Sequence, residues 1–364
     1  MQASPDAITR VSQRLERFVT RLTQEALAET PMARPVTDAA ASALAGGKRL
    51  RAQFLLAGWR AVAEAGGRPS EVPEEVVDAA GALEIFHAAA LVHDDIIDNS
   101  DTRRGRPSAH RALEAQHRSD GWAGDAAGYG RSTAILLGDL LVAWSDDLLE
   151  EGLRTAPRER AIAVRTRYAR MRRDVTVGQY LDIAAEASHP VLAEHEHLDA
   201  ALLVASFKSA RYSVQQPLAI GAALAGSSPA QDDALSAFGH PIGMAFQLRD
   251  DVLGVFGDTA VTGKPAGDDL REGKRTALIA FARAALPPSA RRTLDELLGD
   301  PELDAAQVVA LQGAIRDCGA LDRVEQLIAG YAHEADRALA GAPLGHGAVG
   351  ELRDLAIAAV RREA

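Results

Sequence analysis

Cysteine is almost absent from this chain of 364 residues. Cys318 stands alone, so the chain can build neither an internal disulfide framework nor a cysteine-ligated metal site. Such usage is typical of a protein from a reducing compartment, and we expect a cytoplasmic location. Residues 1–10 contain no apolar core of the kind found in a signal peptide, which agrees with that expectation.

The chain also lacks an excess of positive charge. It has 40 Lys and Arg residues against 51 Asp and Glu residues, a formal net charge of −11. Non-specific binding of nucleic acid depends on a basic surface, so we expect no nucleic-acid partner, although local basic patches remain compatible with this composition. No uninterrupted apolar run is long enough to cross a bilayer, so the sequence predicts no membrane span.

Strand patterns are missing as well. Aromatic residues make up 4 % of the chain, and runs of β-branched residues are scarce. Apolar residues instead recur every three or four positions, for example over 11–27, 76–91 and 242–255, which is the helical period. No low-complexity linker and no repeat of fixed period divides the chain. We therefore predict an all-α protein in which residues 1–364 form a single domain.

Two pairs of adjacent aspartates, each inside an apolar and helix-like stretch, are the main feature that the chain does have. Asp94 and Asp95 are followed by Asp98, and Asp250 and Asp251 form the second pair. Adjacent carboxylates repel each other unless a cation holds them. Mg²⁺ takes oxygen ligands and shares its shell between a few carboxylates and a substrate phosphate. Two acidic clusters facing one cavity would hold several Mg²⁺ ions around a polyphosphate.

The spacing of the first cluster supports a metal site. Asp94 and Asp98 are four residues apart and share one helix face, while Asp95 lies about 100° around the helix. A solvated acidic face is the plainer interpretation of such a run. However, residues 88–92 are apolar all round, which a solvated face would not be. The metal interpretation is therefore favoured.

Basic residues accompany the acidic ones. Gly46 and Gly47 predict a turn before the cations of 48–51, and Arg103 and Arg104 follow the first acidic cluster. Arginine can bind phosphate through two hydrogen bonds, and lysine adds a point charge. A single basic residue is usually a surface charge, so the signal is the repeated pairing of acidic and basic motifs. The glycine spacing fits neither a P-loop nor a dinucleotide fingerprint, so a nucleotide site is not supported.

Taken in chain order, these motifs resemble those of the trans-isoprenyl diphosphate synthases, also called polyprenyl synthetases. The resemblance covers most of the chain, and its motifs are residues 46–51, His87, 94–98, 103–105, 178–182, 208–209, 247–251, 263–264 and 273–276. It implies the isoprenoid synthase fold, a large helical bundle around a central cavity. It also implies a transferase that condenses isopentenyl diphosphate with an allylic diphosphate to make an all-trans polyprenyl diphosphate, here geranylgeranyl diphosphate (C20).

The resemblance further implies a cofactor, partners and a catalytic set. The cofactor is Mg²⁺, three ions in each active site, with Mn²⁺ able to substitute. The allylic substrate is the dimethylallyl, geranyl or farnesyl diphosphate, and the protein is expected to be a homodimer. The residues with catalytic roles are Asp94, Asp95, Asp98, Arg103, Lys208, Gln247, Asp250, Asp251 and Lys264.

Within this set the implied roles differ. The metal ligands are Asp94, Asp98 and Asp250, which Asp95 and Asp251 support through waters. The residues for the allylic diphosphate are Arg103, Lys208 and Lys264, with Gln247 close to the reacting carbons. The residues for isopentenyl diphosphate are Lys48, Arg51, His87 and Arg104.

A few further positions follow from the same resemblance. Asp182 and Gln179 are expected in the cavity wall, and His93 and His110 in structural hydrogen bonds. Lys274 either touches a phosphate or closes a loop. Gly254 is a departure, because the family often has a third aspartate at this position of the second motif. Its loss removes one outer carboxylate, and we do not expect it to abolish activity.

Product length is predicted from the helix before the first cluster. Ala89 and Ala90 lie five and four residues before Asp94, where family members with short products carry a bulky aromatic residue. Phe86 lies eight residues before Asp94, or about 12 Å along a helix. We predict that Phe86 is the floor of the elongation tunnel, and plain core packing of this ring is the alternative.

Two other functions are compatible with parts of this pattern. A class I terpene cyclase shares the helical fold and the first acidic motif, but it needs no isopentenyl diphosphate, so the basic motifs at 46–51 and 103–104 argue against it. A non-catalytic subunit that modulates a partner synthase tends to lose an acidic motif, whereas this chain retains both pairs.

Overall fold

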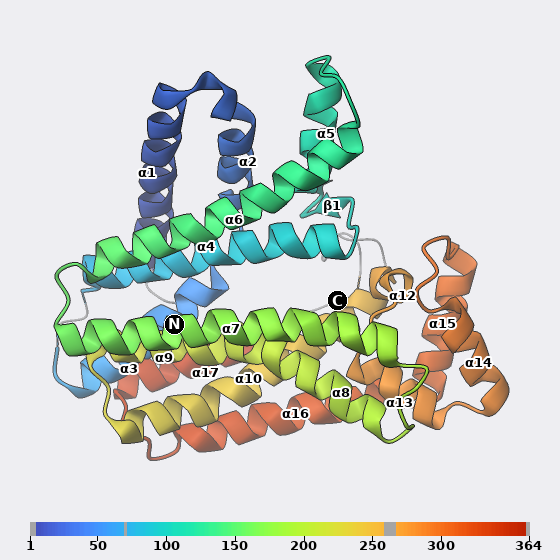
Figure 1. The fold of residues 1–364 in the computed structure, drawn as a ribbon. Helices are drawn as coiled ribbons and strands as arrows, with labels where there is room; N and C mark the ends of the chain where they lie inside the picture. The colour runs from blue at the N-terminus through green and yellow to red at the C-terminus, as the bar shows by residue number, and fades with distance from the viewer. Residues whose placement is uncertain (1–4, 69–70, 258–266, 362–364) are drawn as a thin grey trace.

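The computed structural model describes residues 5–68, 71–257 and 267–361. This part of the chain is almost entirely helical, which confirms the all-α prediction (Figure 1). The first half contains α1 (Pro5–Glu29), the short 3-10 helix η1 (Pro31–Ala33), α2 (Arg34–Leu44), α3 (Leu50–Ala65), α4 (Glu74–Ile97), α5 (Ala109–Ser119), α6 (Ala126–Leu153) and α7 (Arg158–Ser188).

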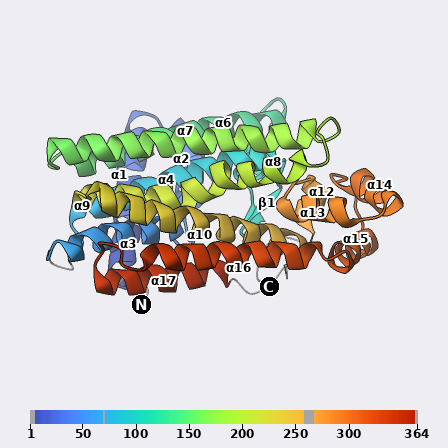
Figure 2. The same ribbon diagram turned by 90° about the horizontal axis from the view of Figure 1, so that it is seen from below.

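The second half begins with α8 (Glu196–Val204), the π-helix η2 (Ala205–Gln215), α9 (Gln216–Ala225) and α10 (Pro229–Phe256). It continues with α12 (Asp268–Glu272), α13 (Ala277–Ala285), α14 (Pro288–Leu297), α15 (Ala305–Asp317), α16 (Ala320–Leu339) and α17 (His346–Val360). Seen from below, α7, α10 and α16 run roughly alongside one another, and α12 to α15 gather at one end of the bundle (Figure 2).

Helix α4 lies at the centre of the bundle and packs against α6, α3 and α1. Every residue from Val76 to Phe86 is buried, so this part of the helix is enclosed on all sides. Among the described helices, α4 alone is long and apolar enough to cross a membrane by length and composition. However, 78 % of its most apolar stretch of 18 residues is buried inside the protein. It is therefore the core helix of the bundle, and its apolar character is explained by packing.

One small hairpin departs from the purely helical expectation. Strand β1 (Thr102–Arg103) pairs antiparallel with strand β2 (Arg106–Pro107) directly after α4. Between them, Arg104 and Gly105 both have positive φ values, 54° and 71°. Two successive left-handed residues give the tight turn that joins antiparallel strands. The hairpin turns Arg103 back toward the end of α4, where it contacts Asp95.

The buried apolar residues form two main clusters. The larger one lies around α3, α4 and α9, and the smaller one joins α13 to α16 at the end of the bundle. Helix α10 contributes Ile242 to the larger cluster and Leu248 to the smaller one. Helix α16 contributes Leu339 to the larger cluster and Val324 to the smaller one. Two continuous helices therefore cross both clusters.

Candidate active site

The C-terminal end of α4 carries the first acidic cluster. Asp94 and Asp95 lie in the last turn, and Asp98 is the residue at which the helix ends. Arg103 of the hairpin donates a hydrogen bond from Nε to Asp95 Oδ1 at 2.8 Å, and its Nη2 lies 3.7 Å from Asp94 Oδ2. The structure therefore balances part of the charge of the aspartate pair with an arginine that follows it in the sequence.

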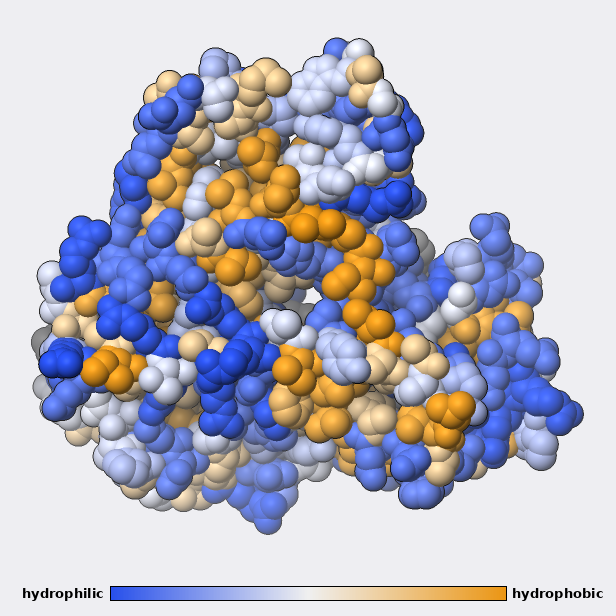
Figure 3. Space-filling model, viewed as in Figure 1, coloured by the Kyte–Doolittle hydropathy of each residue, from blue (hydrophilic) through white to orange (hydrophobic). Residues whose placement is uncertain are grey.

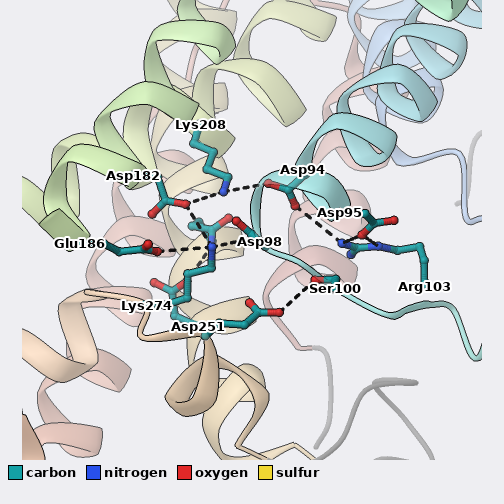
Figure 4. Close-up of polar contacts among 12 residues, drawn as sticks. Asp94, Asp95, Asp98, Ser100, Arg103, Asp182, Glu186, Lys208, Asp251 and Lys274 are labelled. Atoms are coloured by element: carbon teal, nitrogen blue, oxygen red, sulfur yellow. Dashed lines mark hydrogen bonds and ion pairs between the residues drawn. The ribbon is translucent and has the colours of Figure 1, made fainter. Parts of the chain in front are cut away.

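Two lysines from distant segments reach the same carboxylates (Figure 4). Lys208 Nζ donates to Asp182 Oδ2 of α7 at 2.5 Å and lies 3.2 Å from Asp94 Oδ1. Lys274 Nζ, just after α12, donates to Asp98 Oδ2 at 2.7 Å and lies 3.5 Å from Asp182 Oδ2. Burial lowers the pKa of both ammonium groups, but the carboxylates outweigh it and raise the pKa of each above its usual value. Both lysines are therefore charged and bridge α4 to α7.

Sequence reasoning missed one carboxylate in this cluster. Glu186 lies one turn beyond Asp182 on α7, and its Oε1 is 3.6 Å from Lys274 Nζ. Burial raises the pKa of Glu186 to about 7, although the attraction of Lys274 opposes that shift. The only signal in the sequence is the spacing of four from Asp182, which places both side chains on one face of a helix.

Close packing of helices fixes the position of Lys208. A Cβ atom added to Gly178 of α7 would lie 2.3 Å from the backbone nitrogen of Lys208. A Cβ atom added to Gly243 of α10 would lie 2.5 Å from the Cα atom of Ala210. The backbone of η2 is thus held between two helices at positions where only glycine fits. Gly178 belongs to the motif at 178–182, and its lack of a side chain lets α7 approach the backbone of Lys208 closely.

The second acidic cluster is on α10. Gln247 Nε2 donates to Asp251 Oδ1 at 2.6 Å. Burial raises the pKa of Asp251 well above its usual value, and the charges of Asp269 and Asp250 raise it further. A buried carboxyl group among like charges is the environment that a cation would stabilise. Lys264, which the sequence assigned to the allylic diphosphate, lies outside the described residues.

A second group of residues surrounds Arg51, which lies near the start of α3 and contacts Tyr212 and Ser213 in the second half of η2. Its Nη2 donates to Ser213 Oγ at 2.8 Å, and its Cζ lies 4.3 Å from the centre of the Tyr212 ring. The Tyr212 hydroxyl is 3.3 Å from His87 Nδ1. Arg51 and His87, which the sequence assigned to one substrate, are therefore brought to the same aromatic side chain.

Arg104 completes a group of cations here. Its guanidinium lies beside the glycine turn, because a Cβ atom on Gly47 would be 3.1 Å from Arg104 Nη2. Burial lowers the pKa of His87, and the charges of Arg51 and Arg104 lower it further, so this histidine is neutral. Lys48 lies exposed at the edge of the same turn. Several cations with few carboxylates between them favour the binding of an anion.

A buried glutamate supports this group and was also missed. Glu84 of α4 is 4 % exposed and accepts a hydrogen bond from the backbone nitrogen of Ala52 at 3.1 Å. Its other oxygen lies 3.7 Å from Arg49 Nη1, and Arg49 has a φ of 51°. Glu84 therefore fixes the first turn of α3. The sequence contained a signal, since Glu84 is one of only two carboxylates, with Asp78, in the apolar stretch 76–92 of α4.

Three further residues lie in the surroundings of the site. His93 Nε2 is 3.3 Å from the Ile135 carbonyl oxygen, and His110 Nδ1 is 3.2 Å from Ser108 Oγ, so both make the structural contacts that were expected. Gln179 Nε2 on α7 is buried and makes no hydrogen bond.

The residues assigned to product length lie on α4 before the aspartates. Phe86 is 7 % exposed, and its ring packs edge-on against Tyr168 and Tyr212 with centroid distances of 6.3 and 5.9 Å. Ala90 is half-buried and is four residues from both Phe86 and Asp94, so the three share one side of the helix. Ala89 is completely buried. Three aromatic rings therefore meet two turns below the first acidic cluster.

The donor atoms fit Mg²⁺. Both clusters offer carboxylate oxygens, which this hard ion prefers. Asp94 Oδ1 is buried and makes no hydrogen bond, although Lys208 is near it. In the described part of the chain, no three His, Cys, Asp or Glu side chains are gathered closely enough to hold an ion by themselves. This suits an ion whose shell is completed by water and by a substrate's phosphates.

Comparison with known proteins agrees with this geometry. A family model described as polyprenyl synthetase matches residues 34–315. The short chain isoprenyl diphosphate synthase of Methanocaldococcus jannaschii is 31 % identical over 264 residues, 72 % of this chain and 71 % of that protein. The geranylfarnesyl diphosphate synthase of Aeropyrum pernix is 32 % identical over 304 residues, 82 % of this chain and 85 % of that protein.

A solved structure is similar over nearly the whole chain. It is the crystal structure of a geranylgeranyl pyrophosphate synthase from Corynebacterium glutamicum, complexed with isoprenyl diphosphate and magnesium. The TM-score is 0.88 at 40 % sequence identity, and the match covers 97 % of this chain and 98 % of that one.

Proposed function

The chain belongs to the polyprenyl synthetase family and is a prenyltransferase, and from this premise we propose that its main product is geranylgeranyl diphosphate. It would form that product by condensing isopentenyl diphosphate with an allylic diphosphate. The observation that supports the proposal most strongly is the arrangement of two acidic clusters, on α4 and α10, with a group of arginines at the start of α3. The names of the similar proteins from C. glutamicum and A. pernix place the product between C20 and C25.

We assign the two diphosphates to the two groups of cations. Arg103 and Lys208, which already hold the carboxylates of α4, would bind the allylic diphosphate, and Lys264 would join them. Lys48, Arg51, His87 and Arg104 would bind isopentenyl diphosphate. Donors fixed in place stabilise the charge that develops on a leaving group, so Arg103, Lys208 and Lys264 would promote cleavage of the allylic carbon–oxygen bond.

The rest of the reaction depends on a dry cavity. Gln247 would lie beside the reacting carbons, and apolar walls would exclude water from the allylic cation. The double bond of isopentenyl diphosphate attacks that carbon, and the released diphosphate takes the proton that is lost. Mg²⁺, three ions bound by Asp94, Asp98 and Asp250, would supply further stabilisation of the leaving diphosphate, and Mn²⁺ would serve in its place.

An assay of the purified chain alone tests this proposal. The chain would be incubated with isopentenyl diphosphate and, in turn, the dimethylallyl, geranyl and farnesyl diphosphates, and the products separated by chromatography. We expect a C20 product that a chelator abolishes. A cyclic hydrocarbon formed without isopentenyl diphosphate would identify a terpene cyclase, and no product from any pair would identify a modulatory subunit.

Arg51→Ala tests the division of the cations. We expect the KM for isopentenyl diphosphate to rise by on the order of tenfold, because a hydrogen bond between charged groups contributes about 1.5–3 kcal/mol. The KM for the allylic substrate should change much less. Arg353→Ala is the matched control, since Arg353 pairs with Asp336 on the surface. Equal increases in both KM values for Arg51→Ala would contradict the assignment.

We also propose that the protein is a homodimer that associates through the face of α6 and α7. On α6, Ile135 and Leu136 are 46 % and 64 % exposed, and this face of the molecule carries broad hydrophobic surface (Figure 3). Exposed apolar area of this kind marks contact surfaces. Leu136→Glu should convert the dimer to a monomer in light scattering. Val309→Glu on α15, with 65 % exposure at Val309, should leave the mass unchanged.

Two further parts of the proposal concern the whole chain. We propose that residues 1–364 fold as one domain, because α10 and α16 each contribute to both apolar clusters. Separating the clusters would require cutting two continuous helices. We propose a cytoplasmic location, which the presence of a single cysteine supports.

A further inference from the structure

Tyr212 of η2 is the side chain at which two residues of the proposed isopentenyl diphosphate site meet. It is 3 % exposed, and the centre of its ring lies 4.3 Å from Arg51 Cζ. Phe86 packs edge-on against the same ring, with 5.9 Å between the two centroids. The Tyr212 ring is therefore held by a buried neighbour and offers its π electrons to a guanidinium, a contact that attracts the cation.

The winding of η2 brings this side chain to the site. Hydrogen bonds in a π-helix join residues five apart, so Lys208 and Ser213 lie one turn apart along η2. Lys208 Nζ is 3.2 Å from Asp94 Oδ1 of the first acidic cluster, and Ser213 accepts a hydrogen bond from Arg51 at 2.8 Å. One turn of η2 thus links the two groups of cations, with Tyr212 at the end that contacts Arg51.

The hydroxyl group of Tyr212 has a defined direction. Burial raises the pKa of Tyr212 to about 12, so the oxygen keeps its hydrogen at neutral pH. Arg51 carries only donors and a positive charge, so the hydroxyl hydrogen turns away from the guanidinium. Among the described residues, His87 Nδ1 is the only acceptor within reach of this hydroxyl, at 3.3 Å. The hydroxyl therefore donates to His87 Nδ1.

The tautomer of His87 follows from this hydrogen bond. The histidine is neutral, because burial and the charges of Arg51 and Arg104 oppose the binding of a second proton. A neutral imidazole carries one hydrogen, and the hydrogen bond made by one ring nitrogen decides which nitrogen holds it. With Nδ1 accepting from Tyr212, the hydrogen lies on Nε2. A diphosphate anion accepts hydrogen bonds, so a neutral His87 can hold it only through this Nε2–H group.

We propose that Tyr212 is a positioning residue of the isopentenyl diphosphate site, whose ring supports Arg51 and whose hydroxyl keeps the hydrogen of neutral His87 on Nε2. The ligand is the diphosphate group of isopentenyl diphosphate, so the inference rests on the proposed function. Tyr212 acts on that group through the two side chains that it contacts.

Two variants of Tyr212 separate the hydroxyl from the ring. Tyr212→Phe keeps the ring beside Arg51 and removes the donor to His87, so the KM for isopentenyl diphosphate should rise by about 3- to 10-fold. Tyr212→Leu removes both and should raise it by about 10- to 100-fold. The KM for the allylic substrate should change much less. Tyr331→Phe is the matched control, because it removes the hydroxyl of a half-buried tyrosine on α16 and should alter neither KM.

His87→Gln tests whether the hydroxyl acts through His87. A glutamine amide can turn its NH₂ group toward a diphosphate without a hydrogen bond from Tyr212. Adding Tyr212→Phe to His87→Gln should therefore change the KM for isopentenyl diphosphate by less than about twofold, since the effects of coupled residues are not additive. The same increase in both backgrounds would overturn the proposed route through His87.

NMR spectroscopy observes the tautomer directly. In protein labelled with ¹⁵N-histidine, ring nitrogens with and without a hydrogen resonate in separate regions, and the signals lost in His87→Gln identify His87 among the ten histidines. We expect the hydrogen on Nε2 in the wild type and a mixture of tautomers in Tyr212→Phe. A hydrogen on Nδ1 in the wild type would contradict the inference.

Arg51→Ala separates this inference from the proposed function. An unchanged KM for isopentenyl diphosphate in Arg51→Ala would overturn the division of the cations itself. An increase in Arg51→Ala, with normal values in Tyr212→Phe and Tyr212→Leu, would overturn this inference alone.

Discussion

Asp94→Ala is expected to lower turnover by on the order of 10²-fold or more, the size of effect seen when a group that stabilises a leaving oxygen is removed. Asp94 is assigned to the metal, and it also lies 3.2 Å from Lys208 and 3.7 Å from Arg103. Its loss would therefore weaken the ion site and release two cations that are assigned to the allylic diphosphate. The measurement is kcat at saturating substrates over a range of Mg²⁺ concentrations.

A neighbouring aspartate provides the matched control for this variant. Asp101 follows the same cluster, but its side chain is 69 % exposed and pairs with Arg111 at 2.6 Å. Asp101→Ala should stay within about twofold of the wild type, as surface substitutions usually do. Near-normal turnover in Asp94→Ala would remove the metal assignment of the first cluster.

Phe86→Ala is expected to lengthen the product by at least one five-carbon unit. The Phe86 ring packs against Tyr168 and Tyr212, and removing it opens space below the two alanines that lead down from the aspartates. A phenylalanine at Ala89 should shorten the product, because a ring there would stop the chain about one turn earlier. Ala90→Phe should shorten it too, since Ala90 shares the helix side of Phe86 and is less buried than Ala89.

Stability losses must be separated from changes in product. Phe86→Ala removes a buried ring, which typically costs about 3–5 kcal/mol, and overpacking at Ala89 typically costs about 1–3 kcal/mol. The measurement is therefore the product distribution at a temperature where every variant is folded. Phe18→Ala on α1, which removes a fully buried ring, should lose stability and keep the product length. If the three variants on α4 keep the wild-type length, another helix forms the floor.

The helical fold and the positions of the acidic clusters could be predicted because both are encoded locally. The apolar period of three to four residues predicts α4 and α10, and the aspartates lie within those patterns. The family motifs then identify Lys208, which the structure places against Asp94 and Asp182. Local periodicity and short motifs need no knowledge of the tertiary fold.

The remaining features depend on residues that are distant in the sequence. Lys274 meets Asp98 across 176 positions, and no pattern in either segment indicates the other. The π-helix containing Lys208 requires the close approach of α7 and α10 at Gly178 and Gly243. The position of Asp269 beside Gly254 likewise requires the chain to return from α12 to α10. Such contacts arise only when the helices pack.

The two lysines between the carboxylates of α4 and α7 would couple the binding of a metal ion to the binding of a diphosphate. A divalent ion bound by Asp94 and Asp98, as proposed, would have to displace Lys208 and Lys274 from them, so an ion alone would compete with tethered positive charge. A diphosphate that arrives with the ion accepts the displaced lysines. Each ligand would therefore strengthen the binding of the other, by the reciprocity that holds for any pair of coupled sites. We therefore expect the metal–diphosphate complex to bind as a unit and free metal to bind weakly.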